Sequence, residues 1–290
     1  MKIVNREGHE IEFDQSQNRL LQKLYGNVLG RLILKVLTLP FITQFGGWYM
    51  NSPLSKGRIS SFVKKNHIDM SQYEDKEYQN YNDFFTRKIK EGQRPIDFDK
   101  NHLISPADSK LSYYSIQSDT HFTIKDTTYS LKDLLQDEKL ALQYEGGTCL
   151  IFRLTVDDYH RYCFIDSGTK EEDHYIPGIF HTVNPIANDY YPIYKQNSRS
   201  YCMLHTDHFG DVIYMEVGAM MVGKICNHPI TKFQRGDEKG YFEFGGSTIV
   251  LLIEKDKVEI DEDIMNHSQN HYETRVLMGE KIGVKKESLC

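Results

Sequence analysis

The chain has 290 residues, of which 39% are hydrophobic and 26% are charged, and its formal net charge is −6. This balance is typical of a globular protein and excludes a disordered chain, and the length is sufficient for a sizeable buried core. The acidic net charge argues against nucleic acid as a partner, because proteins that bind it carry an excess of Lys and Arg.

Charge is unevenly distributed in the first quarter of the chain. The opening residues 1–6 lack the apolar segment of a secretory signal, so none is expected. Residues 15–68 contain no Asp or Glu, and their basic residues are Arg19, Lys23, Arg31, Lys35, Lys56, Arg58, Lys64 and Lys65. A basic segment on an acidic protein favours an anionic surface, usually a lipid bilayer. We therefore expect a peripheral protein at the cytoplasmic face of the cell membrane.

Residues 17–70 have a helical pattern and include an uncharged stretch at residues 36–53. Pro40, Gly46 and Gly47 interrupt this run, which disfavours a transmembrane span. A helical portion that lies on the membrane fits the pattern better. The alternative is a helical pair that packs on the rest of the protein without touching lipid.

Further along, a helix is predicted over residues 82–94, ending near Gly92, and a short one at Leu131–Leu135. After residue 100, short runs of β-branched and aromatic residues alternate with turn signals, as at 149–154, 212–217 and 249–253. No regular alternation of strands and helices is present. The predicted fold class is therefore α+β, with a helical, basic, membrane-associating portion at residues 1–80 and a mainly antiparallel β domain at residues 81–290.

The cysteines number five, which is odd, and none form a C-x-x-C pair: they are Cys149, Cys163, Cys202, Cys226 and Cys290. In a chain of this length, that pattern predicts reduced cytosolic thiols. It favours neither a disulfide framework nor a zinc site, and no metal is expected.

The segment from Gly240 to Ile253 is the most informative one. A strand pattern enters, Gly245 and Gly246 interrupt it, and a second strand pattern begins at Ser247. The ordinary interpretation is a hairpin turn with an incidental serine. The functional interpretation is self-cleavage, in which the serine hydroxyl attacks the preceding carbonyl, the resulting ester eliminates, and the serine remnant hydrolyses to a pyruvoyl group. A glycine before the serine suits this chemistry, because it lacks a Cβ that would obstruct attack.

Such a serine also needs a base, and the base needs an orienting carboxylate. Asp108 lies in a predicted turn, and His160 follows the predicted strand at 149–154. Taken singly, each residue has an ordinary structural explanation, since Asp is common in turns and His is common on surfaces and in cores.

The joint pattern is more specific than any single residue. The segments that together match the motifs of one known family are, in order along the chain, Phe84–Lys88, Gly92–Ile96, Ser105–Asp108, Ile124–Lys125, Tyr129–Leu131, Asp158–Arg161, Thr182–Pro185, Val217–Ala219, Val222–Gly223 and Phe244–Thr248. With these segments, residues 80–255 resemble the phosphatidylserine decarboxylase family. The resemblance implies decarboxylation of phosphatidylserine, held in anionic membranes, to phosphatidylethanolamine, through a Schiff base with a pyruvoyl group derived from Ser247. It also implies cleavage between Gly246 and Ser247 into a β chain, 1–246, and an α chain, 247–290, which remain together as a heterodimer.

The resemblance assigns roles to individual residues. Asp108 matches the family's charge-relay aspartate, and His160 matches the first histidine of its D-Y-H-R-x-H pattern. The second histidine of that pattern, usually assigned to self-cleavage, is replaced here by Cys163. Either His160 serves both self-cleavage and decarboxylation, or His181, which lies beside the matching segment Thr182–Pro185, supplies the missing base.

Two other functions remain open at this stage. A Ser-His-Asp hydrolase would use the same residue types, although the chain lacks G-x-S-x-G. A lipid-binding module that never undergoes cleavage would account for the missing second histidine.

Overall fold

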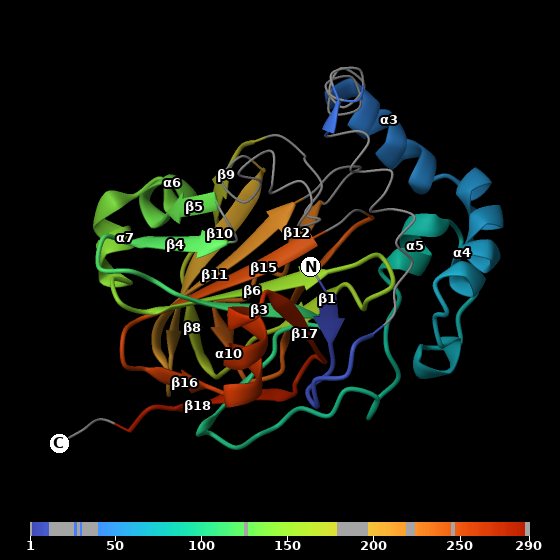
Figure 1. Cartoon of the computed structure of the whole chain (residues 1–290). Coiled ribbons are helices and arrows are strands. Elements are labelled where there is room, and N and C mark those ends of the chain that lie inside the picture. Colours follow the sequence, from blue (N-terminus) through green and yellow to red (C-terminus); the bar gives the residue numbers. More distant parts are fainter. Residues whose placement is uncertain are drawn as a thin grey trace.

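The computed structural model describes residues 2–11, 26–27, 30, 40–124, 127–178, 197–218, 224–244 and 247–287. Strands dominate this part of the chain, and its helices are short (Figure 1). All the strand pairings within it are antiparallel except that of β1 (Lys2–Val4) with β17 (Tyr272–Val276). The predicted α+β class with a mainly antiparallel β domain is confirmed.

The main sheet contains ten of the described strands. Their order across the sheet is β1, β17, β3 (Ser109–Ser115), β6 (Thr148–Leu154), β15 (Ser247–Ile253), β11 (Gly210–Gly218), β10 (Arg199–Thr206), β8 (Gly168–Lys170) and β13 (Lys232–Phe233), with β9 (His174–Ile176) also pairing with β10. All seven residues of β15 pair with both β6 and β11. The strands predicted at 149–154, 212–217 and 249–253 are thus confirmed, and they lie next to one another.

Smaller sheets complete the domain. They are β12 (Ile225–Asn227) with β14 (Glu238–Phe242) and β7 (Arg161–Cys163), β16 (Val258–Ile260) with β18 (Lys281–Lys285) and β2 (His102–Ile104), and the hairpin of β4 (His121–Ile124) and β5 (Thr127–Ser130). The sheet of β7 and β14 matters most for function, because β14 leads towards Gly245 and Gly246 and β7 follows His160 directly.

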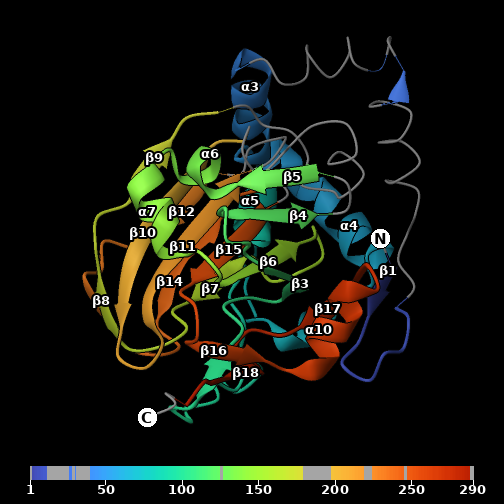
Figure 2. The ribbon, with the colours of Figure 1, turned by 60° about the vertical axis from the view of Figure 1, so that its left-hand side comes forward.

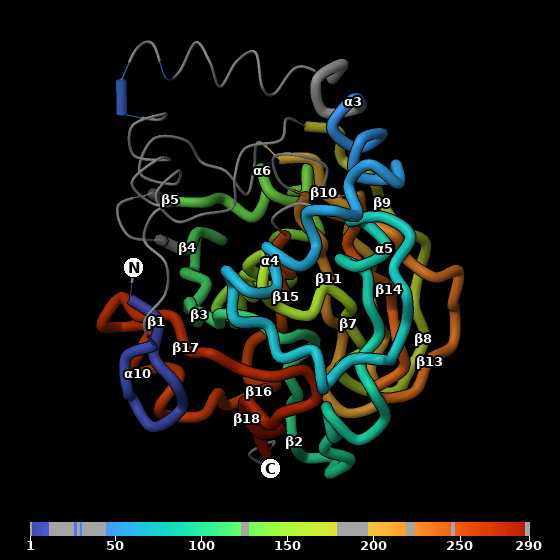
Figure 3. The backbone as a smooth tube through the Cα atoms, turned by 90° about the vertical axis from the view of Figure 1, so that its right-hand side faces the viewer, coloured from blue at the N-terminus to red at the C-terminus, as the bar shows by residue number. Residues whose placement is uncertain are grey.

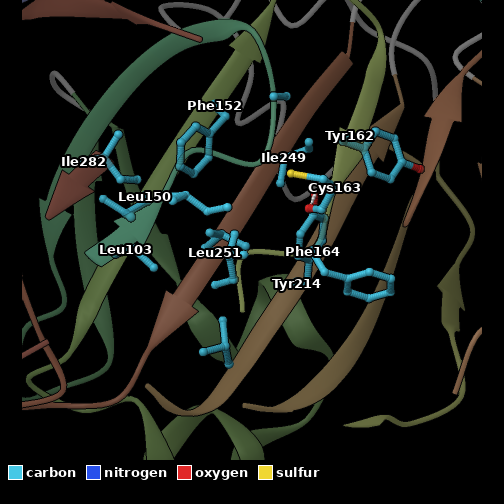
Figure 4. Close-up of a cluster of buried hydrophobic side chains, with 14 of the residues drawn as sticks. Leu103, Leu150, Phe152, Tyr162, Cys163, Phe164, Tyr214, Ile249, Leu251 and Ile282 are labelled. Atoms are coloured by element: carbon cyan, nitrogen blue, oxygen red, sulfur yellow. Dashed lines mark hydrogen bonds between the residues drawn. The ribbon is translucent and has the colours of Figure 1, made fainter. Parts of the chain in front are cut away.

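Both faces of β15 are buried, as its continuous apolar sequence predicts. Since successive side chains of a strand point to opposite faces, Ile249 and Leu251 join one cluster of core residues, and Val250 and Leu252 join another. The first cluster, shown in Figure 4, is covered by the small sheets. The second is covered by β4, β5, α6 (Leu131–Leu135) and α7 (Glu138–Gln143), which lie together in Figure 2. The predicted helix at Leu131–Leu135 is confirmed.

The helices that precede the sheets are α3 (Pro40–Met50), η1 (Pro53–Arg58), α4 (Ile59–Lys65), η2 (Met70–Gln72) and α5 (Tyr81–Phe85), and α10 (Glu262–Gln269) lies near the end of the chain. The helical prediction for residues 17–70 is confirmed for most of residues 40–65, whereas residues 66–69 form a turn and irregular chain, and most of residues 17–39 lie outside the described part. In Figure 3, α4 and α5 lie on the near side of the molecule, and α3 extends above them. No described helix is both long enough and apolar enough to span a bilayer.

The helix predicted over residues 82–94 is wrong beyond Phe85. The backbone N–H of Thr86 still donates to the Asn82 carbonyl, but the chain then extends. Lys88 O accepts from Glu74 N at 2.9 Å, and Lys90 N donates to Gln72 O at 2.8 Å. Through this antiparallel contact, the backbone of residues 88–90 forms hydrogen bonds with residues 72–74 instead of those of a helix. Nothing in the sequence near residues 86–94 predicts the contact.

Candidate active site

Ser247 is the first residue of β15 and is completely buried. The expected pattern of one strand entering and another leaving is confirmed, although Gly245 and Gly246 lie outside the described residues. Cross-strand neighbours of Ser247 are Leu154 and Gly218, of which the second has no side chain. Its Oγ has no hydrogen-bond partner within the described part of the chain. A buried hydroxyl without a partner costs about 1–3 kcal/mol, and such groups often mark a reactive site.

His160 is also completely buried, in the loop between β6 and β7. Its Nδ1 lies 3.0 Å from the carbonyl oxygen of Asp158. Because a carbonyl can only accept, Nδ1 carries the proton and Nε2 presents its lone pair. This Nε2 is likewise without a partner among the described residues. Burial, reinforced by the charge of Arg87, lowers the pKa of His160 to about 3, so the imidazole is neutral near pH 7.

Phe85 brings the His160 loop and the segment before Ser247 together. Its ring centroid lies 4.1 Å from that of His160 and 5.2 Å from that of Phe244. The backbone also connects them, because Phe242 N donates to the His160 carbonyl at 2.9 Å. By the alternation of β15, Ser247 belongs to the face that carries Ile249, which is the face covered by β7 and β14. The two unpartnered atoms therefore belong to one buried region.

The conformation of the His160 loop is fixed by two buried cations. Lys110 Nζ donates to the Asp158 carboxylate at 2.6 Å, and Thr155 N donates to the same group at 2.6 Å. Arg87 donates from Nη2 to the carbonyls of Asp157 and Asp158, at 3.3 and 3.2 Å. The second of these carbonyls is the one that accepts from His160, so these contacts fix the tautomer of the imidazole.

Asp108 lies in the turn between β2 and β3, as its sequence predicts, and is almost completely buried. Two nitrogens of Arg94 donate to the carboxylate, Nε at 2.8 Å to Oδ1 and 3.0 Å to Oδ2, and Nη2 at 2.6 Å, and Met278 N also donates to it at 2.9 Å. The hydrogen bond at His160 Nδ1, which the aspartate of a Ser-His-Asp hydrolase would accept, goes instead to a backbone carbonyl. The relay role of Asp108 stays a prediction.

Comparison with known proteins is decisive for the family. A family model described as phosphatidylserine decarboxylase matches residues 81–284. The chain belongs to the phosphatidylserine decarboxylase family. It is 50% identical over 283 residues to phosphatidylserine decarboxylase proenzyme 2 of Clostridium acetobutylicum, with 97% of each chain covered.

Two further relatives support the assignment. The phosphatidylserine decarboxylase proenzyme of Clostridium botulinum is 41% identical over 294 residues, which cover 99% of this chain and 100% of the relative. That of Desulfitobacterium hafniense is 43% identical over 274 residues, with 92% of each chain covered. The resemblance drawn from the sequence motifs is thereby confirmed.

Within this phosphatidylserine decarboxylase family member, Cys163 is an unsuitable base. It is buried in the core cluster that includes Ile249 (Figure 4), and burial raises the pKa of its thiol to about 12. The thiol therefore stays protonated at neutral pH. Cys149, Cys163, Cys202 and Cys226 are free in the structure, and Cys290 lies outside the described residues. His181 also lies outside them, so its role stays a prediction.

Several residues of this region were not predicted from the sequence. Arg87 belongs to a matching segment, but nothing local distinguishes a buried guanidinium from an exposed one. Phe85 belongs to the same matching segment, but nothing local places its ring against His160, and Asn82 gave no signal beyond helix formation. Within the described ranges, no group of three His, Cys, Asp or Glu side chains could hold a metal ion.

Proposed function

We propose that this chain decarboxylates phosphatidylserine to phosphatidylethanolamine with a pyruvoyl group that it makes from Ser247 by self-cleavage. The observation that carries the proposal is the pair of buried atoms without partners in the described residues, Ser247 Oγ and His160 Nε2. In the sequence, two glycines directly precede Ser247. The family and its relatives, which are named as proenzymes, support the same conclusion.

Self-cleavage proceeds in three steps that conserve atoms. Ser247 Oγ attacks the carbonyl carbon of Gly246, and His160 Nε2 takes the hydroxyl proton and delivers it to the departing nitrogen, which leaves an ester and a free amine. The Cα proton of residue 247 is then removed and the Cβ–Oγ bond breaks, which gives a Gly246 carboxylate and a dehydroalanine. Water replaces the amine nitrogen, ammonia leaves, and a pyruvoyl group remains.

Residues around Ser247 fit such a group. The pairing of β15 with β6 and β11 would hold it in place, and burial would exclude bulk water. A pyruvoyl group supplies an electron sink for the loss of CO2 from an amino-acid headgroup. His160, in the same buried region, would remain a neutral imidazole whose Nε2 can hold or release a proton, while the carbonyl of Asp158 keeps Nδ1 protonated.

The two chains formed by cleavage would remain together as a heterodimer. The α chain would start at β15, at the centre of the main sheet, and would also supply β17, which pairs with β3 and β1. Arg153 of the β chain forms a buried ion pair with Glu273 of the α chain, with Nε and Oε1 2.7 Å apart. Separation would expose the core and break this pair.

We further propose that residues 1–80 are a membrane-associating portion and residues 81–290 the catalytic domain, at the cytoplasmic face of the membrane. Three large apolar side chains near α3 are exposed, with 60% of Phe45, 61% of Trp48 and 74% of Leu54 accessible. Basic residues follow within the next turns of helix, and the cytoplasmic leaflet is anionic. An exposed apolar group flanked by cations suits the interface of a bilayer that contains phosphatidylserine.

Denaturing electrophoresis and mass spectrometry of the purified protein test the function. We expect a C-terminal fragment of residues 247–290, which is 290 − 246 = 44 residues long, with a mass that matches an N-terminal pyruvoyl group. Ser247→Ala should give one uncut chain without decarboxylase activity. A protein that releases CO2 from phosphatidylserine while its chain stays whole would refute the proposal.

A further inference from the structure

Asn82 connects the segment before the cleavage site to helix α5. Its Oδ1 accepts a hydrogen bond from the backbone N–H of Phe244 at 2.9 Å. Phe244 lies only three positions before Ser247, and Asn82 is buried, with 8% of its surface exposed. The aromatic ring of Phe244 is held by the same helix, edge-to-face with Tyr81 at 5.0 Å and with Phe85 at 5.2 Å.

The orientation of the Asn82 amide is fixed by its partners. A backbone N–H can only donate, so the oxygen of the amide must face Phe244. Its Nδ2 then donates to Asn51 Oδ1 at 3.1 Å, and Asn51 in turn uses its own Nδ2 to donate to Gly47 O at 3.0 Å. Each amide therefore has one orientation that satisfies all its partners, and the acceptor for Phe244 is set before any chemistry occurs.

Two fixed points bracket the bond that is cleaved. Ser247 is fixed on one side by its pairing with Leu154 and Gly218, and Phe244 is fixed on the other by Asn82. By sequence, only Gly245 and Gly246 lie between them. Glycine has the greatest backbone freedom of any residue, so an unanchored glycine pair would sample many conformations in which the Gly246 carbonyl is out of reach of the serine hydroxyl.

We propose that Asn82 is a positioning residue for self-cleavage, which anchors the scissile segment at Phe244 so that the Gly246 carbonyl meets Ser247 Oγ. The inference rests on the proposed function. Asn82 touches neither reacting atom, and its effect is to reduce the conformations available to the segment.

The test is a time course of cleavage, started by refolding or by synthesis in a cell-free system and followed by electrophoresis. Asn82→Leu removes the acceptor while keeping the branched shape of the side chain, and it should slow cleavage about 10- to 100-fold, the range expected for a small misplacement of reacting groups. Asn82→Asp keeps an oxygen for Phe244. Asn51, which is exposed, can turn its amide to donate to the new carboxylate and give up its bond to Gly47 O, so the rate should return to within about threefold of the wild-type value.

Two further variants act as controls. Ser268, on α10, also uses its side-chain oxygen to accept a hydrogen bond from a backbone N–H, that of Tyr113 at 2.9 Å. The Ser268→Ala chain should be cleaved at the wild-type rate. Asn51→Ala removes only the contact towards α3 and should stay within about threefold of wild type, because the bond to Phe244 remains.

A second readout does not depend on cleavage. In a Ser247→Ala background, hydrogen exchange of the peptide that contains Phe244 should become faster with Asn82→Leu and stay slow with Asn82→Asp. Three outcomes would overturn this inference and leave the proposed function standing. They are equal cleavage rates for wild type and Asn82→Leu, slowing by Ser268→Ala or Asn51→Ala as large as that by Asn82→Leu, and hydrogen exchange at Phe244 that Asn82→Leu does not change. Failure of the wild-type chain to cleave would overturn the proposed function as well.

Discussion

Ser247 and His160 are each buried with a polar atom that has no partner in the described part of the chain. Burial without a partner is unfavourable for either residue, yet it suits a nucleophile and its base. A hydroxyl or imidazole that is already engaged would have to break a hydrogen bond before reacting. The carbonyl of Asp158 determines the tautomer of the His160 imidazole, because it accepts a hydrogen bond from Nδ1 and leaves Nε2 as the only basic nitrogen.

The identity of the base can be tested at single residues. We expect His160→Gln to leave the chain uncut, because the substitution removes the lone pair at Nε2, and His181→Gln to cleave at the wild-type rate. Cys163→Ala should also cleave, since its thiol is protonated. The measurement is the fraction of the 44-residue fragment over time. An uncut His181→Gln chain together with normal cleavage in His160→Gln would reverse the assignment and divide the two roles between the histidines.

The depressed pKa of His160 also predicts how stability depends on pH. The folded chain holds this imidazole neutral down to a pKa of about 3, whereas its ordinary pKa is 6.5. Between these values the unfolded chain binds a proton that the folded chain does not, so the free energy of unfolding falls as the pH falls. From pH 7 to pH 5 the loss from this residue is about 2 kcal/mol.

Urea unfolding of two uncut chains isolates this contribution. Ser247→Ala should lose stability between pH 7 and pH 5 more steeply than Ser247→Ala/His160→Gln, in which residue 160 does not titrate. The other titrating groups are common to both chains, so they cancel in the difference. Parallel curves for the two chains would contradict the assignment of a buried neutral imidazole.

At the scale of single elements, the sequence pattern correctly predicted those helices and strands whose formation depends on their own residues. Helix α6 was predicted at its observed bounds, because three of its five residues are apolar and lie on one buried face. The strand β15 was predicted from its apolar run and the glycines before it. The extended path after Phe85 was not predicted, because it depends on hydrogen bonds to residues 72–74 that compete with the helix.

The same distinction holds for the site. Ser247, Asp108 and His160 were identified from motifs, but their partners come from distant segments. Arg94 could be placed beside Asp108 only by the fold, and Met278, which also bonds Asp108, is 170 positions away. Asn82 reaches Phe244 across 162 positions. Local sequence carries no record of such contacts, because they are set by how the sheets and α5 pack.

For the whole molecule, the order of the main sheet explains how one chain can be cut and still keep its fold. The predicted cleavage point lies at the first residue of the central strand, so cleavage there affects only the first pair of the ladders of β15 with β6 and β11 and leaves the pairs of residues 248–253 in place. The cut would also leave the tie between α5 and Phe244 intact. Maturation by the proposed cleavage would therefore need chemistry between Phe244 and Ser247 and no rearrangement of the core.

The outer side of the helical portion gives the last prediction, which concerns the membrane. Trp48 is the only tryptophan of the chain, so its fluorescence reports on this surface alone. Adding vesicles that contain phosphatidylserine should shift its emission to shorter wavelength, because the indole moves into the apolar boundary of the bilayer. Salt should weaken binding, since the cations of residues 15–68 contribute through screened attraction.

Replacing Phe45 and Leu54 by Ser should reduce vesicle binding, measured by co-sedimentation, at least tenfold, because burial of each large apolar side chain contributes about 1.5–3 kcal/mol. The matched control is the pair Phe98→Ser and Leu142→Ser, which removes two other exposed apolar side chains, 71% and 56% accessible, outside residues 1–80. Cleavage should proceed in both double variants, since none of these residues belongs to the buried region around Ser247. Equal binding to neutral and anionic vesicles, or equal losses in the two double variants, would show that this face is not the one that meets the bilayer.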